Sequence, residues 1–192
     1  LLTAELIERL RALPSHDEIL ADAFARAPVV AGFAVTDQAF GRPPLRRSGF
    51  AAAGTDPRRF LPDYPGAVVN LEIFEQAASG NASFSVAAST GGVIRSIPLV
   101  QQIQGTIYPA LTTESLRVAQ GASTIVTRSS DASGEVDLGG RLALTELRVG
   151  AFDVPVTADG QIWVHYTLDR TERTIPAWRI LEDDPDPAVI DA

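Results

Sequence analysis

Five side chains in this sequence belong to types that commonly hold a small ligand. They are Arg95, Tyr108, Trp163, His165 and Tyr166. An arginine offers a planar fork of N–H donors that matches a carboxylate or a phosphate. A histidine can act as a ligand or change its charge near neutral pH. We take these five residues as the candidate ligand-binding residues of the chain.

Arg95 is the most unusual of the five because of the strand expected to carry it. Residues 93–104 are expected to form one long strand, whose side chains alternate between two faces. One face carries Val93, Arg95, Ile97, Leu99, Gln101 and Ile103. An unpaired buried guanidinium is costly, so Arg95 must pair with an acid, reach water along its stem, or meet an anionic ligand. Buried charges are usually paired, which favours a structural role. Pro98 donates no ladder hydrogen bond and predicts an edge or a bulge.

Trp163, His165 and Tyr166 belong to an expected hairpin. Residues 147–156 and 161–168 are apolar-rich and flank Thr-Ala-Asp-Gly at 157–160, and Asp-Gly between two such runs is a strong hairpin signal. Trp163 and His165 share one face of the second strand. His165 could be a ligand or a pH switch, but a partly exposed strand histidine is the more common case.

No group of residues predicts catalysis or metal binding. The sequence has no cysteine and two histidines, His16 and His165, far apart along the chain. It has no Gly-x-Ser-x-Gly elbow and no phosphate-binding loop. The acidic run within residues 129–140 has the wrong ligand spacing for a calcium loop. We therefore expect a domain that is not an enzyme and that has no cofactor.

Composition sets the broad class. A length of 192 residues predicts a single domain with a real core. The net charge of -8 argues against a nucleic-acid partner. No apolar run is long enough to span a membrane, and the absence of methionine suggests a piece of a longer protein.

The expected elements indicate an α/β domain with a mixed central sheet and flanking helices. The unit at residues 80–121, a strand, a long strand and a helix, is expected to be the centre on which the rest packs. Before it we expect helices at 2–13, 15–26 and 71–79 and strands at 29–35 and 67–70; after it we expect a strand at 124–128. Ser15 and Glu18 form a capping-box pattern, Gly80 is expected just past a helix end, and Ile19, Leu20, Ala23 and Phe24 are expected to face inward.

Residues 36–66 lack periodicity and are expected to form a long surface loop. The segment carries five arginines interleaved with phenylalanines: Arg42, Arg46, Arg47, Arg58, Arg59, Phe40, Phe50 and Phe60. Such a loop could bind an anion or a protein. A solvated loop pinned by its aromatic side chains is favoured, since runs of charge usually serve solvation.

Five segments, in this order, resemble the CHASE sensor domain of type two. They are LPSHDEILADAFARAPVVAGFAV at 13–35, TGGVIRSIPL at 90–99, IYPALTTESLRVAQGAST at 107–124, VPVTADGQIWVHYT at 154–167 and TIPAWRIL at 174–181. The resemblance implies an extracytoplasmic sensory domain of bacterial adenylate or guanylate cyclases and sensor kinases. It implies a position on the periplasmic or extracellular side of the membrane, and it provides no ligand or catalytic residue to carry over.

The resemblance also implies partners. The parent protein would add flanking strands, membrane helices and a cyclase or kinase output, and the domain could form a weak homodimer. The signal would be an unknown small molecule or protein. The alternative is a protein-interaction module that uses residues 36–66, and a secreted hydrolase would need a catalytic group that the sequence does not present.

We predict that the purified chain binds no stoichiometric zinc or other transition metal, because no thiolate exists and the two histidines are distant. Elemental analysis of the purified protein checks this. One tightly held metal ion per chain would contradict it.

Overall fold

The computed structural model describes residues 3, 8, 13, 15–86, 92–133, 141–168 and 176–181. The elements in chain order are α2 (His16–Ala25), β1 (Val30–Thr36), β2 (Gly49–Ala53), the 3-10 helix η1 (Pro57–Arg59), β3 (Asp63–Tyr64), β4 (Gly66–Val68), α3 (Glu72–Ala77), β5 (Gly80–Ser83), β6 (Ser96–Pro98), β7 (Val100–Ile103), β8 (Thr106–Pro109), α4 (Leu111–Ala119), β9 (Thr124–Ser129), β10 (Leu144–Val149), β11 (Phe152–Pro155), β12 (Gln161–Trp163) and α5 (Ala177–Ile180). The expected helix at 2–13 lies mostly outside these residues, and so do residues 182–192.

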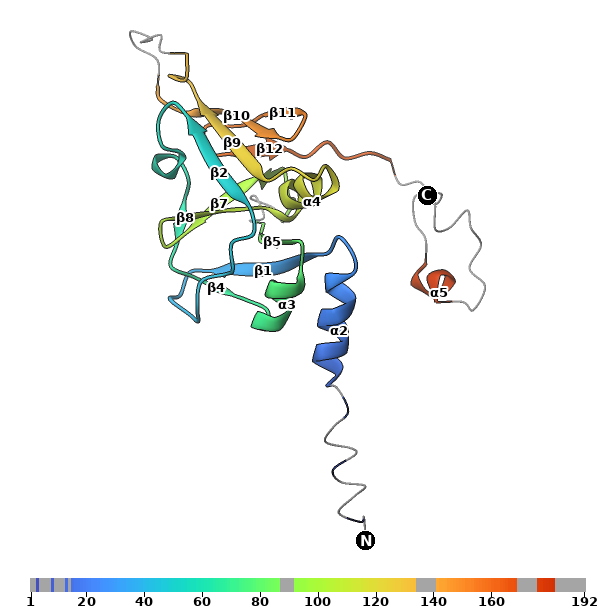
Figure 1. Ribbon diagram of the computed structural model, residues 1–192. Helices are drawn as coiled ribbons and strands as arrows, with labels where there is room; N and C mark the ends of the chain where they lie inside the picture. Colours follow the sequence, from blue (N-terminus) through green and yellow to red (C-terminus); the bar gives the residue numbers. More distant parts are fainter. Residues whose placement is uncertain are drawn as a thin grey trace.

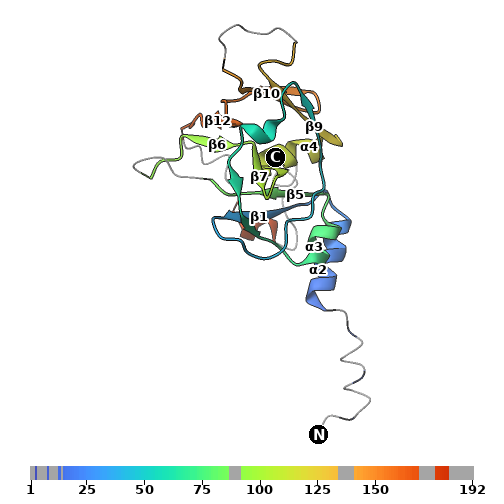
Figure 2. The same ribbon diagram turned by 90° about the vertical axis from the view of Figure 1, so that its left-hand side faces the viewer.

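The strands form several mixed sheets, which confirms the α/β class. In one sheet β1 lies between β4, its antiparallel neighbour, and β5, its parallel neighbour (Figure 1). A single parallel bridge between Ser83 and Ala110 places the end of β5 beside the end of β8, which continues into the sheet β3-β7-β8. A second group has the order β11-β10-β9-β2, and β6 pairs with β12 (Figure 2).

The hairpin β7–β8 is buried on both faces and separates two apolar cores. The larger core contains Leu61, Leu99, Val100, Ile107, Ile125, Leu144, Leu147 and Val149. The smaller core contains Phe33, Ala67, Ile103 and Tyr108. Ile107 and Tyr108 are consecutive on β8 and therefore enter opposite cores. The Tyr108 ring meets Phe33 edge to face, with the ring centroids 5.5 Å apart. The expectation that residues 80–121 form the centre of the domain agrees with this arrangement.

The second helix begins as expected but buries a different face. Ser15 and Glu18 form a capping box at the start of α2. Ile19 and Leu20, expected to face inward, are 50% and 44% exposed. The small Ala21 is the buried position of α2, because this helix packs on α3 rather than on a sheet.

The expected loop at 36–66 is wrong, because it contains β2, η1 and β3. β2 pairs in parallel with β9, more than seventy residues later along the chain, and becomes the outermost strand of its sheet. Its sequence, Gly-Phe-Ala-Ala-Ala, shows no clear alternation of apolar and polar residues. The strand therefore depends on a distant partner, which local pattern cannot reveal.

The expected single strand at 93–104 is also wrong. It divides at Leu99 into β6, which pairs with β12, and β7, which pairs with β3 and β8. Pro98 is the last residue of β6, at the point where the chain changes partner. Gln104 and Gly105, with φ of 48° and 75°, then form a tight turn. A tight loop was expected after the long strand, but the strand β8 that follows the turn was not.

The expected hairpin around 157–160 is wrong in its partners. The actual hairpin joins β10 to β11 and turns at Gly150, whose φ is 57°. A turn does form at 157–160, where the Gly160 N–H donates to the carbonyl of Thr157. It directs β12 to β6 instead of back to β11.

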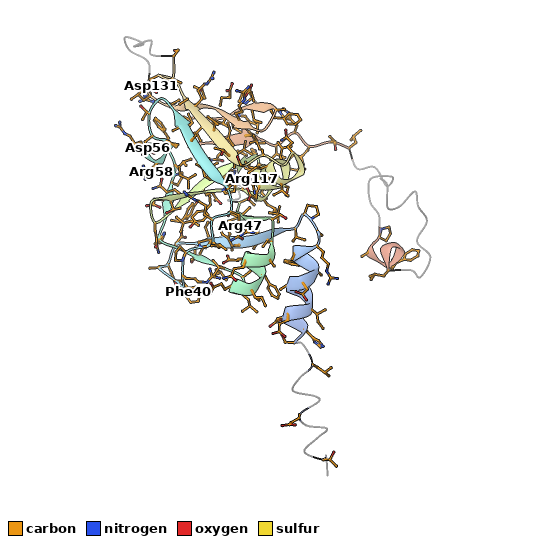
Figure 3. All side chains as sticks on the ribbon, viewed as in Figure 1. Phe40, Arg47, Asp56, Arg58, Arg117 and Asp131 are labelled. Atoms are coloured by element: carbon orange, nitrogen blue, oxygen red, sulfur yellow. The ribbon has the colours of Figure 1, made fainter. Side chains whose placement is uncertain are left out.

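Gly80 opens β5 instead of following a helix end, and a buried ion pair explains why glycine is there. A Cβ at Gly80 would lie 2.7 Å from Cγ of Glu114. Glu114 is fully buried and accepts from Nε and Nη2 of Arg117 at 2.8 and 2.7 Å. Hydrogen bonding to Glu114 raises the pKa of Arg117. Arg117, labelled in Figure 3, also donates to the carbonyls of Ser79 and Ala122, so this pair joins α4 to the residue before β5 and to the chain just after α4.

We predict that Glu114→Gln lowers the free energy of unfolding by about 3–5 kcal/mol, because it leaves the buried Arg117 without its counter-ion. Urea unfolding measures this. The matched double variant, Glu114→Leu with Arg117→Met, should lose less stability than the sum of the losses for Glu114→Leu alone and Arg117→Met alone, by at least about 1 kcal/mol. Additive losses would show that the pair is not coupled.

Candidate functional site: an arginine-lined pocket

A pocket of about 430 Å³ opens beside β2, where η1 approaches the turn between β7 and β8. Its lining combines charged, polar and apolar side chains with backbone. The lining residues are Arg46, Phe50, Ala51, Ala52, Gly54, Asp56, Pro57, Arg58, Gly105, Thr106 and Ile107. Small-molecule sites have this size and this combination of apolar wall and few polar groups.

One arginine of the pocket is already neutralised. Asp56 caps η1 by accepting from the Arg58 N–H at 3.0 Å, and Nε and Nη2 of Arg58 donate to the same carboxylate at 2.9 and 2.5 Å. The Arg58 side-chain hydrogen bonds lower the pKa of Asp56, and those bonds raise the pKa of Arg58. Figure 3 shows the two residues together on the β2 side of the domain.

Arg46 is the other arginine, and within the described part of the chain it makes no hydrogen bond or ion pair. It is exposed at the pocket wall. Burial raises the pKa of the Tyr108 hydroxyl, and the positive charge of Arg46 opposes that rise. The pocket therefore keeps one positive charge that no described carboxylate compensates.

A buried carboxylate anchors the segment that carries Arg46. Glu75 on α3 is fully buried, and its Oε2 lies 2.5 Å from Nη1 of Arg42. Its other oxygen accepts from Nδ2 of Asn81 at 2.8 Å. Arg42 in turn donates to the carbonyl of Asn70 at 3.0 Å. These contacts hold the chain before Arg46 against α3 and β5.

Main-chain contacts fix the residues on both sides of Arg46. The Tyr108 hydroxyl donates to the carbonyl of Pro44 at 3.0 Å, and Nδ2 of Asn81 donates to the carbonyl of Leu45 at 3.0 Å. After Arg46, Nε of Arg47 donates to the carbonyl of Ala78 at 3.0 Å. Arg46 thus follows two residues whose carbonyls are held and precedes a residue whose side chain is held.

A carboxylate just past the end of β9 holds the chain where it leaves β2. Asp131 accepts from the backbone N–H of Thr55 at 3.0 Å and from its hydroxyl at 2.7 Å, and it also accepts from the hydroxyl of Ser129. These hydrogen bonds hold the pKa of Asp131 well below its usual range, with the Ser129 contact first among them. They fix the corner at Gly54 and Thr55, where β2 turns into η1 along the pocket.

The structure brings four of the five sequence-predicted residues together, but outside the pocket beside β2. Arg95, Trp163, His165 and Tyr166 lie on and beside the β6–β12 pair, where the Val164 N–H donates to the carbonyl of Arg95. Arg95 is exposed, so the expectation that its side chain lies on a buried face is wrong; the break at Leu99 removes that face. Tyr166 donates to the carbonyl of Ile94 at 2.7 Å.

Tyr108 is separate from those four. It is buried in the smaller core, and it reaches the pocket only through its contact with the Arg46 segment. Sequence reasoning did not select Arg46, Phe50 or Arg58 as site residues. The available signal was the alternation of arginine and phenylalanine at 36–66, which was assigned to solvation.

The described residues present neither a metal centre nor a membrane span. They contain no group of three or more histidine, cysteine, aspartate or glutamate side chains arranged to hold a metal ion. None of their helices has the length and apolarity needed to cross a bilayer.

Comparison with known proteins identifies a family for the chain. A family model described as CHASE2 domain matches residues 2–192. No curated protein and no solved structure matches the chain.

We predict that Asp131→Asn lowers stability at neutral pH and that the loss shrinks in acid. The folded pKa of Asp131 lies below its unfolded value, so the carboxylate adds stability above the ordinary aspartate pKa of about 4, and that gain is lost as pH falls through the folded pKa. Urea unfolding between pH 7 and pH 2.5 measures the difference. Asp153→Asn, at an exposed pair with Arg148, is the control and should show a smaller difference at neutral pH. A pH-independent difference for Asp131→Asn would contradict the assignment.

Proposed function

Because this chain belongs to the CHASE2 domain family, whose members are extracytoplasmic sensory domains, we propose that it senses the signal for a bacterial transmembrane receptor. The output would be an adenylate or guanylate cyclase or a kinase in the same protein. The observation that carries a sensing role in this chain is the pocket with one uncompensated arginine on an anchored segment.

The lining residues support binding rather than catalysis. They include arginine, aspartate and threonine, but no histidine, cysteine or serine that could serve as a base or nucleophile. Hydrogen bonds from Arg58 lower the pKa of Asp56, the carboxylate in this lining, and so make it a weak base. A domain of this kind would act on its receptor through ligand binding alone.

The walls of the pocket suggest how binding could affect the fold. Phe50 lies on β2, the outermost strand of the β11-β10-β9-β2 sheet, and Pro57 lies on η1, which follows it. Thr106 and Ile107 belong to the β7–β8 hairpin. A ligand in contact with both walls favours the arrangement in which they are correctly spaced. It would shift the population of receptor states by its difference in affinity for them.

A protein partner is the second candidate signal, and the β6–β12 pair favours it. Trp163 and Tyr166 are 63% and 69% exposed there, beside Arg95 and His165. Tryptophan, tyrosine and arginine are enriched where proteins bind one another. This surface would serve the interaction-module alternative and would use the residues that the sequence selected.

Cysteine labelling in the parent receptor tests the position of the domain. The 192 residues contain no cysteine, so Ala158→Cys introduces a single exposed thiol in the turn before β12. A membrane-impermeant maleimide should label this variant in intact spheroplasts. Ala82→Cys, at a fully buried position, is the control and should be labelled only after denaturation. Labelling of Ala158→Cys that requires permeabilised membranes would place the domain in the cytoplasm and contradict the proposal.

A second measurement tests coupling. Deleting residues 15–181 from the parent receptor should change its cyclase or autophosphorylation rate in isolated membranes. An unchanged rate would contradict a sensing role.

A further inference from the structure

We infer that the pocket beside β2 binds a small organic anion with an apolar body, whose charged group lies against Arg46. The inference names a ligand class for the site and rests on the proposed sensing function for its biological meaning. The binding itself depends on the pocket, and the contacts of the lining residues support it in four ways.

The first support is local charge. The lining contains Arg46 and Arg58, and of these Arg58 donates from Nε and Nη2 to the carboxylate of Asp56. One positive charge therefore remains in the pocket, while the whole chain carries -8. An anion that approaches this acidic protein gains a favourable contact where an arginine has no carboxylate partner.

The second support is preorganisation. The carbonyls of Pro44 and Leu45 accept from side chains on β8 and β5, and the side chain of Arg47 donates to the carbonyl of Ala78. Arg46 lies between these fixed points, so a ligand pays little to order the backbone that presents its guanidinium. Displacing this segment would remove half-buried Arg42 from fully buried Glu75 and leave that carboxylate without its cation, which is costly.

The third support is the apolar wall. Phe50, Pro57 and Ile107 line the same pocket, and Phe50 and Ile107 are also part of the packing around the larger core. Pro57 and Ile107 are buried, and the apolar lining that remains accessible is that of half-buried Phe50 and of exposed Ala51 and Ala52. A hydrated inorganic ion would leave this surface exposed to water, whereas a ring or short chain would cover it. The volume of about 430 Å³ suits a molecule of that size.

The fourth support is the supply of polar groups opposite Arg46. Thr106 contributes a hydroxyl to the lining and makes no side-chain hydrogen bond within the described residues. β2 is the outermost strand of its sheet, so part of its backbone has no strand neighbour on one side. Carboxylate and phosphate oxygens accept from such donors, and both groups therefore fit the site.

Titration of the 192-residue chain with four probes tests the inference. Benzoate and phenyl phosphate carry an anionic group on an apolar ring, benzamide is a neutral analogue, and inorganic phosphate lacks the ring. Amide NMR signals of Gly54, Gly105 and Thr106 report binding at the pocket. We expect benzoate or phenyl phosphate to shift these signals saturably, with benzamide and inorganic phosphate at least tenfold weaker. The stronger of the two anions identifies the carboxylate or the phosphate class.

Two variants with opposite expected effects make the test specific. Arg46→Gln should weaken binding of the aromatic anion at least tenfold, and Asp56→Asn should strengthen it severalfold because it releases Arg58. Arg141→Gln makes the same change of charge at an exposed position outside the pocket and should leave binding unchanged. The amide spectrum of each variant shows whether it is folded.

Three results would overturn the inference: no saturable shift with either aromatic anion, equal binding of inorganic phosphate, or unchanged binding in Arg46→Gln. Each is measured on the isolated chain and does not involve the receptor. A cytoplasmic position or an uncoupled output in the receptor experiments would remove the proposed function and leave a measured binding site. Failure of the titration would leave the sensor assignment standing with another kind of signal.

Discussion

The burial of the Glu75 carboxylate determines how the segment between β1 and β2 packs on the rest of the domain. Glu75 has no exposed surface, and an ionised carboxylate in that position needs a cation and hydrogen-bond donors. Arg42 and Asn81 supply them from two different parts of the chain. Because Arg42 must reach Glu75, residues 42–45 pack against α3 and β5. This packing sets the position of Arg46. Arg46, which has no partner among the described residues, is thus placed by the contacts that buried Glu75 requires.

The β7–β8 hairpin has a similar role between the two cores. Because both of its faces are buried, it contacts the core under β9 and β10 with one face and the core beside β1 with the other. Tyr108 belongs to the second core by its ring and to the Arg46 segment by its hydroxyl. The turn at Gly105 extends from this hairpin to the pocket, so the pocket forms where a rigid central element meets the edge strand β2.

This arrangement suits a domain that reports a signal through its own conformation. The proposed ligand would lie at the rim between β2 and the β7–β8 hairpin, with Asp131 fixing the corner after β2 and the Glu75 network fixing the segment that carries Arg46. β2 and the β7–β8 hairpin belong to different sheets, and among the described strands no ladder of hydrogen bonds joins the two sheets. Binding energy at such a junction acts on the spacing of the two sheets and leaves each of them intact.

The sequence alone determined the features that depend on neighbouring residues. The capping box at Ser15 and Glu18, the strands at β1 and β9, the short helix α3, the α/β class and the family resemblance all arise from local pattern, and local hydrogen bonding or alternation is sufficient to produce them. Tertiary structure decided which strands pair. β2 exists because β9 lies beside it, and the chain divides at Leu99 because β6 and β7 have different partners. Arg95, which the sequence indicated as a ligand-binding residue, is exposed because of that division. Arg46, which the sequence did not indicate, is positioned by contacts of Glu75, Asn81 and Tyr108 with the residues before it. Pairing over long separations is set by the packing of whole faces, and no local period in the sequence records it.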